Sequence, residues 1–161
     1  MKRLFIANRG EIAVRIARSA EEVGIEIAAV IPPQDVSSPL CELLTRSLPA
    51  SSNEEAREMF LDSNRMVEIA RLLGCDAVHP GYGFLSENAA FAEAVEAAGL
   101  IWVGPPACAI RTMGDKSMAR NVASAAKVPL APGVSIPAGQ QTLSEEDLNK
   151  IGFPMMIKAA A

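Results

Sequence analysis

Residues 4–31, LFIANRGEIAVRIARSAEEVGIEIAAVI, decide the fold expected for this chain. The uninterrupted apolar run Leu4–Ala7 indicates a strand, and a tight turn follows it. The apolar residues then change to helical spacing, at Ile12, Ile16, Ala20 and Val23. Gly24 ends this helix, and a second apolar run, 25–31, follows at once. A strand, a helix and a strand in this order predict a crossover connection between parallel strands.

The same alternation returns in the second half of the chain. We expect helices over 63–73 and 89–98, each ended by a glycine, and strands over 77–78 and 100–103. We assign no helix or strand to residues 32–56, because residues 40–48 fit either a strand or one helical turn. The prediction is an α/β fold, a doubly wound, Rossmann-like parallel sheet flanked by helices.

The remaining third of the chain continues with shorter elements. Helices are expected over 107–112 and 116–126, followed by an extended stretch, 129–136. Ser144 is placed to cap a further helix, with Asp147 in the capping-box position. The apolar residues 153–158 then predict a last strand.

The amino-acid composition argues against several kinds of partner and site. Lys and Arg number 15 against 19 Asp and Glu, a mild acidity that argues against nucleic acid or a membrane surface as partner. The cysteines, Cys41, Cys75 and Cys108, lack CxxC spacing, so neither a metal site nor a disulfide framework is expected. The apolar run after the basic start is too short for a signal peptide, so a cytoplasmic location is expected.

The turn after the first strand argues against a dinucleotide site. It reads Ala7-Asn8-Arg9-Gly10-Glu11, which lacks the GxGxxG pattern and places bulky side chains where a pyrophosphate would approach the backbone. A hydride-transferring dehydrogenase is therefore disfavoured.

The decapeptide His79-Pro80-Gly81-Tyr82-Gly83-Phe84-Leu85-Ser86-Glu87-Asn88 predicts a functional loop at the carboxyl edge of the sheet, where open α/β sheets bind ligands. His79 is a general-base candidate, although a histidine here more often bonds to the backbone and shapes its loop. Gly81 and Gly83 are expected to relieve backbone strain or to allow another segment to approach closely. Ser86 and Glu87 are expected to orient the loop, and Asn88 to cap the next helix.

Two lysines indicate an anion site. Lys116 begins a helix, where a cation is disfavoured unless an anion lies near. Lys158 ends an apolar strand and must reach solvent or meet an anion. Together they suggest one polyphosphate.

Several segments, in this order and at this spacing, resemble the biotin carboxylase family: 6–13, the loop 79–88, 104–106, 113–116 and 153–159. The resemblance covers the chain from end to end as the amino-terminal region of that family. It implies a Rossmann-like domain over 1–112 that precedes an ATP-grasp fold, with 113–161 as the truncated start of the ATP-grasp region.

The resemblance also implies a function. The family is an ATP-dependent, ADP-forming ligase that uses ATP, Mg²⁺ and bicarbonate to carboxylate biotin on a carrier protein or domain, which a carboxyltransferase then uses. Lys116 and Lys158 match its ATP-binding lysines, and Arg18 and Glu22 become candidate residues of a homodimer contact. No catalytic residue and no metal ligand of the family falls within this chain, so the isolated chain is expected to be inactive. The final carboxyl acceptor cannot be read from it.

The chain also departs from the family pattern. It ends at Ala161, before the glycine-rich run that closes over ATP in the family; residues 31–61 differ; and Lys127 stands where a helix-ending glycine is common. Two alternatives stay open: a non-catalytic dimerisation or docking module of the same fold, or another ATP-grasp ligase.

Overall fold

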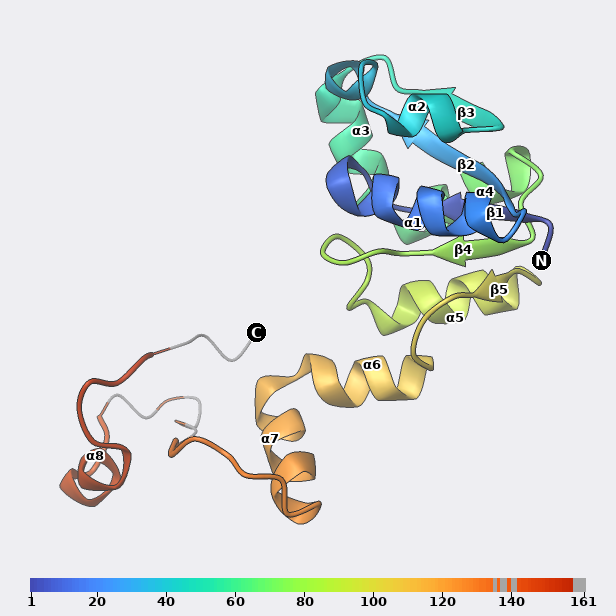
Figure 1. The fold of residues 1–161 in the computed structure, drawn as a ribbon. Coiled ribbons are helices and arrows are strands. Elements are labelled where there is room, and N and C mark those ends of the chain that lie inside the picture. Colours follow the sequence, from blue (N-terminus) through green and yellow to red (C-terminus); the bar gives the residue numbers. More distant parts are fainter. Residues whose placement is uncertain (135, 137–138, 140–141, 158–161) are drawn as a thin grey trace. The chain divides into compact units, whose positions relative to one another are not determined.

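The computed structural model describes residues 1–134, 136, 139 and 142–157, and the chain divides into two compact units, Met1–Arg111 and Thr112–Ala161. The first unit contains a five-stranded parallel sheet with the strand order β3-β2-β1-β4-β5 (Figure 1). Its strands are β1 (Arg3–Ile6), β2 (Glu26–Ile31), β3 (Arg46–Pro49), β4 (Ala77–His79) and β5 (Ile101–Trp102). The predicted doubly wound parallel sheet is confirmed.

Helices cover both faces of this sheet. They are α1 (Gly10–Glu22), the 3-10 helix η1 (Pro33–Asp35), α2 (Leu40–Leu43), α3 (Asn53–Met59), α4 (Ser63–Leu72) and α5 (Ala89–Ala97). The buried residues of α1 and α2 belong to one core cluster, and those of α3, α4 and α5 belong to the other.

The central strand β1 supplies both cores, because successive side chains of a strand point to opposite faces. Leu4 and Ile6 pack with the α1 side, whereas Phe5 packs with the α3, α4 and α5 side. All three side chains are almost fully buried. Burial on both faces explains why this strand is apolar without alternation.

The tract that the sequence left unplaced contains both elements that were considered for it. Residues 40–43 form α2, and 46–49 form β3, which pairs with β2 at the edge of the sheet. The residues of β3 are exposed or half-buried, so this strand lacks an apolar signature. Thr45 fixes its start, since the Thr45 hydroxyl donates to the Ile27 carbonyl at 2.8 Å.

The second unit consists of short helices in its described part. Helix α6 (Ala107–Gly114) crosses the boundary between the units, and α7 (Lys116–Ala125) and α8 (Glu145–Ile151) follow. Ser144 caps α8 as predicted, its hydroxyl accepting from the Asp147 amide at 3.1 Å.

The predicted strand over 153–158 is wrong for 153–157, which form neither strand nor helix. A strand needs a neighbouring strand for its backbone hydrogen bonds, and the sheet found among the described residues lies wholly within Met1–Arg111. Within the described ranges, no helix is long and apolar enough to cross a membrane.

Candidate functional site

The candidate site lies where β1 and β4 end side by side. The chain runs outward from β1 through β2 to β3, then returns to the other side of β1 with β4, so the strand order reverses between β1 and β4. Ile6 pairs with His79, and the Ala7 amide donates to the His79 carbonyl at 2.9 Å. The turn after β1 and the loop His79–Asn88 therefore leave the sheet together, at the position where open α/β sheets bind ligands.

Asn8 joins these two segments. Its side-chain amide Nδ2 donates to the carbonyls of Pro80 at 2.7 Å and Tyr82 at 2.8 Å, and its Oδ1 accepts from the Arg9 amide at 2.9 Å. The Asn8 side chain is only 2% exposed. A buried amide whose donors and acceptor are all used fixes the segments that it contacts, because breaking these bonds would leave buried polar groups unpaired.

His79 shapes its own loop, as expected. Its Nδ1 accepts a hydrogen bond from the Gly81 amide at 3.0 Å, which leaves the proton of the neutral ring on Nε2. Partial burial lowers the pKa of His79 below its ordinary value, because burial disfavours the imidazolium ion. The neutral form is therefore the one present at physiological pH.

The loop backbone is left-handed at three of four consecutive residues. The φ angles are +66° at Gly81, +68° at Gly83 and +46° at Phe84. A Cβ added at Gly81 would lie 2.7 Å from Asn8 Nδ2, so the predicted close approach of another segment is confirmed at this glycine. Phe84 adopts the same conformation without the freedom of glycine, which costs about 1–2 kcal/mol.

The end of the loop is fixed by backbone contacts and by a helix cap. The Ser86 amide donates to the Gly83 carbonyl at 2.9 Å, and Asn88 Oδ1 caps α5 by accepting from the Phe91 amide at 3.2 Å. Among the described residues, the side chains of Ser86 and Glu87 have no hydrogen-bond partner, so the end of the loop is oriented by the Ser86 amide and the Asn88 cap.

Arg9 connects the turn to the segment after β2. Its guanidinium forms a two-pronged ion pair with Asp35, with Nε–Oδ2 at 2.8 Å and Nη2–Oδ1 at 2.7 Å. The hydrogen bond to Asp35 raises the pKa of Arg9. The loops that follow β1, β2 and β4 are thus tied together by two adjacent residues, Asn8 and Arg9.

A pocket of about 360 Å³ opens beside this ion pair. Phe84 lines it and stacks on the buried Phe60, with the ring centroids 5.1 Å apart. Arg57 of α3 also lines it and has no ion-pair or hydrogen-bond partner within the described part of the chain.

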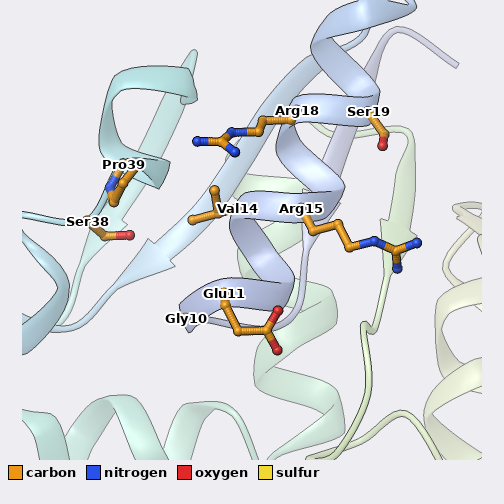
Figure 2. Close-up of a pocket in the computed structure, with 8 residues that line it drawn as sticks. All are labelled: Gly10, Glu11, Val14, Arg15, Arg18, Ser19, Ser38 and Pro39. Carbon is orange, nitrogen blue, oxygen red and sulfur yellow. The ribbon is translucent and has the colours of Figure 1, made fainter.

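A second pocket, of about 600 Å³, lies along α1 (Figure 2). Arg18, a predicted dimer residue, lines it, and Figure 2 shows its side chain extending toward the segment that carries Ser38 and Pro39. Glu22 is exposed one turn further along and does not line the pocket. Arg18 and Glu22 have no polar partner among the residues that the structure describes.

The two predicted ATP lysines are not brought together by what the structure describes. Lys116 is the first residue of α7, exposed, next to Asp115, whose carboxylate caps the helix by accepting from the Met118 amide at 2.8 Å. Lys158 lies outside the described residues. A common phosphate site for the two lysines stays a prediction.

The described residues show no cluster of metal-binding side chains, and the thiol of Cys75 is buried. These residues hold no group of three or more His, Cys, Asp or Glu placed to bind a metal ion. Cys75 is buried, and burial raises the pKa of its thiol to about 11, so it is not a reactive thiolate at neutral pH.

Sequence reasoning assigned no role to Asn8, Arg9 or Asp35. The available signal was an amide and a guanidinium directly after a buried strand, facing a neighbouring loop with a glycine at its close-approach point. Their partners could not be named in advance, because Asn8 contacts residues more than 70 positions away.

Comparisons with known proteins agree with this arrangement. The sequence model of the family described as biotin carboxylase, N-terminal domain, matches residues 1–110. Biotin carboxylase 1 of Bacillus subtilis is 41% identical over 161 residues, which are 100% of this chain and 36% of that protein. The alpha3 subunit of a biotin-dependent acyl-coenzyme A carboxylase from Mycobacterium leprae is 40% identical over 98% of this chain and 26% of that protein.

Solved structures give the same result. The biotin carboxylase domain dimer of the Hydrogenobacter thermophilus 2-oxoglutarate carboxylase, in complex with MgADP, ADP and bicarbonate, matches with a TM-score of 0.80 and 32% identity. The match covers 95% of this chain and 33% of that one. The biotin carboxylase domain of a single-chain bacterial carboxylase matches with a TM-score of 0.78 and 39% identity, over 86% of this chain and 32% of that one. The chain thus spans about a third of the domains that it resembles.

Proposed function

Because this chain belongs to the family of biotin carboxylase N-terminal domains, we propose that it is the amino-terminal part of an ATP-dependent biotin carboxylase. The complete enzyme would use ATP and bicarbonate to carboxylate biotin on a carrier protein or domain. The family match over residues 1–110 carries this proposal. The connected loops at the carboxyl edge of the sheet support it, because they supply a preformed wall for a ligand.

We propose that residues 113–161 begin the ATP-grasp region and that Lys116 and Lys158 bind the phosphates of ATP. Lys116 is exposed at the start of α7, where an anion would offset its unfavourable position at the positive end of the helix dipole. The related Hydrogenobacter thermophilus domain was solved with MgADP and bicarbonate, which fits the use of ATP and Mg²⁺. Biotin and Mg²⁺ would be held by parts of the enzyme beyond this chain.

Partners follow from the same proposal. A biotin carrier and a carboxyltransferase would act with the complete enzyme, and Arg18 and Glu22 would lie in a homodimer contact. Both side chains are exposed, and the Hydrogenobacter thermophilus relative was solved as a dimer. The cytoplasmic location expected from the sequence stays a prediction.

The test of the ATP site uses the full-length protein and Lys116→Ala. The loss of a charge-assisted contact of about 1.5–3 kcal/mol raises the apparent KM for ATP in bicarbonate- and biotin-dependent ATP hydrolysis by about 10- to 150-fold. Lys150→Ala, in the last turn of α8, is the matched control and leaves the KM unchanged. An unchanged ATP dependence in Lys116→Ala would remove this lysine from the site.

The alternative of a non-catalytic module has one observation in its favour: Arg18 lines an open pocket and has no polar partner among the described residues. Reading the gene beyond codon 161 separates the two functions. A glycine-rich run after Ala161 supports the enzyme, whereas a stop codon supports a module that dimerises or docks.

A further inference from the structure

Asn8 is the single buried polar side chain among the residues that the structure describes. Burying an amide is unfavourable unless its hydrogen bonds are made, and here both donated bonds and the accepted one are present. Its donors reach two carbonyls of the same loop, those of Pro80 and Tyr82, on either side of Gly81. The side chain therefore holds the loop at two points.

The fit between Asn8 and the loop is tight. The Asn8 side chain occupies the space that a Cβ of residue 81 would need, with Nδ2 at 2.7 Å and Cγ at 3.0 Å from that position. Only glycine allows this approach, and only a side chain with two amide hydrogens on one atom can serve both carbonyls at once. The contact depends on both residues.

The loop that this contact holds carries exposed side chains, although its Leu85 is buried in the core. Between and beside the fixed points, Tyr82 is 59% exposed and Phe84 is 42% exposed, and Phe84 keeps a left-handed backbone. Backbone strain of this kind persists only where the surroundings impose it, and it concentrates at ligand sites. Two aromatic side chains are thus presented at the carboxyl edge of the sheet, where the neighbouring strands β1 and β4 end.

We propose that Asn8 is a positioning residue for the reaction, which holds Tyr82 and the rest of the loop in the orientation that faces the substrates. This inference rests on the proposed function, since it takes the loop to border the active site of the complete enzyme. The side-chain contacts of Asn8 are to Arg9, Pro80 and Tyr82 and not to the proposed phosphate ligand Lys116, so we expect its loss to affect turnover rather than the binding of ATP.

Asn8→Asp tests this role in the full-length protein. The substitution keeps the size of the side chain and replaces the donor with an oxygen that faces two carbonyls. The kcat of biotin-dependent ATP hydrolysis falls by about 100-fold, the effect of a displacement of about 1 Å, whereas the KM for ATP stays within about twofold. Asp62→Ala is the control, because it removes the cap of α4 far along the chain and leaves kcat unchanged.

Two further measurements keep the proposal falsifiable. Hydrogen exchange on the 161-residue chain reports the loop directly, and the hydrogen-bonded amides of Gly81 and Ser86 exchange faster in Asn8→Asp than in the wild type. Gly81→Ala displaces Asn8 without altering its chemistry and reproduces the loss of kcat, which covers the case in which Asn8→Asp fails to fold.

These measurements separate a failure of the positioning role from a failure of the proposed function. A wild-type kcat in Asn8→Asp, a matching loss in Asp62→Ala, or a lower kcat with unchanged loop exchange would overturn the positioning role. A wild-type full-length protein without biotin-dependent ATP hydrolysis would overturn the proposed function, and the exchange experiment would then still show whether Asn8 holds the loop.

Discussion

The two units of this chain are stabilised by different kinds of contact. In Met1–Arg111 the sheet carries a buried core on each face, and Phe5, Phe60 and Phe91 are almost completely removed from solvent. In the described part of Thr112–Ala161 no residue is buried. The first unit is held by tertiary burial, whereas the helices of the second depend on local contacts.

The helix ends differ between the units at α7 but not at α8, which is followed by Gly152 with φ +75°. In the first unit α1, α4 and α5 are each followed by a glycine with a positive φ, namely Gly24, Gly74 and Gly99. In the second unit α7 is followed by Lys127, which takes the same left-handed conformation with φ +57°. A lysine there pays a conformational cost that glycine avoids.

Helix caps and a hydrogen bond from Arg120 to the Ala131 carbonyl stabilise the described part of the second unit. Asp115 caps α7 and Ser144 caps α8, while apolar residues of α7 such as Met118 and Val122 stay about half exposed. Caps contribute about 0.5–2 kcal/mol each, less than the burial of one large side chain. The comparison therefore teaches that the stability of this chain resides in Met1–Arg111.

The largest expected effect is that of Phe5→Ala, which opens a cavity beneath β1. We expect the free energy of unfolding to fall by about 3–5 kcal/mol, because Phe5 is fully buried. Urea unfolding of the 161-residue chain, followed by the fluorescence of its single tryptophan, Trp102, measures this change.

Met118→Ala is the matched control for that experiment. Met118 is 49% exposed in α7, so its truncation should change the free energy of unfolding by less than about 0.5 kcal/mol. A comparable loss in both variants would break the comparison, because it would show that the second unit also contributes a packed core.

A smaller effect is expected at the end of α7. Lys127→Gly removes the left-handed penalty and stabilises the helix by about 0.5–1 kcal/mol after the greater chain entropy of glycine is deducted. Hydrogen exchange of the α7 amides should slow by about 2- to 5-fold, with no shift of the urea midpoint reported by Trp102. Lys127→Ala keeps the penalty and should leave exchange unchanged; equal protection in both variants would rule out the backbone explanation.

The smallest effect is a dependence on pH confined to the first unit. Burial lowers the pKa of His79 below its ordinary value of about 6.5, so the unfolded chain binds more protons once the pH falls below that value. The contribution of His79 to stability is thus fully present above about pH 6.5 and is lost as the pH falls through the pKa of His79 in the folded chain.

His79→Asn isolates this dependence, because the asparagine Oδ1 can replace Nδ1 as acceptor for the Gly81 amide but does not titrate. Urea unfolding at about pH 7.5 and about pH 5.5 should show a larger loss for the wild type than for the variant. Since His79 is the only histidine of the chain, equal losses would place the pH dependence elsewhere.

Sequence reasoning succeeded where periodicity and caps were strong. The strand–helix–strand unit of 4–31, the helices α4, α5, α6 and α7, and the Ser144 cap are present as predicted. It failed where the signal was short or polar. The seven-residue helix α3 was not foreseen, and the edge strand β3, exposed on most of its residues and ending in Pro49, was left unresolved.

The predicted strand over 153–158 failed for a different reason. An apolar run indicates that burial is favourable, but a strand also needs a neighbouring strand. Among the described residues of the second unit there is none. The candidate site shows the same limit, because the loop His79–Asn88 was predicted, whereas its attachment to Asn8 was not.

The sequence by itself determined the strand–helix–strand unit of 4–31, the parallel sheet and the loop at its carboxyl edge, because periodicity, turns and caps act over a few neighbouring residues. Only the tertiary structure decided which segments meet there. The register of Ile6 with His79 brings Asn8 against Gly81, and Arg9 against Asp35 follows from the position of β2 on the other side of β1. Such contacts join residues far apart in the chain, so they exist only once the strands have paired.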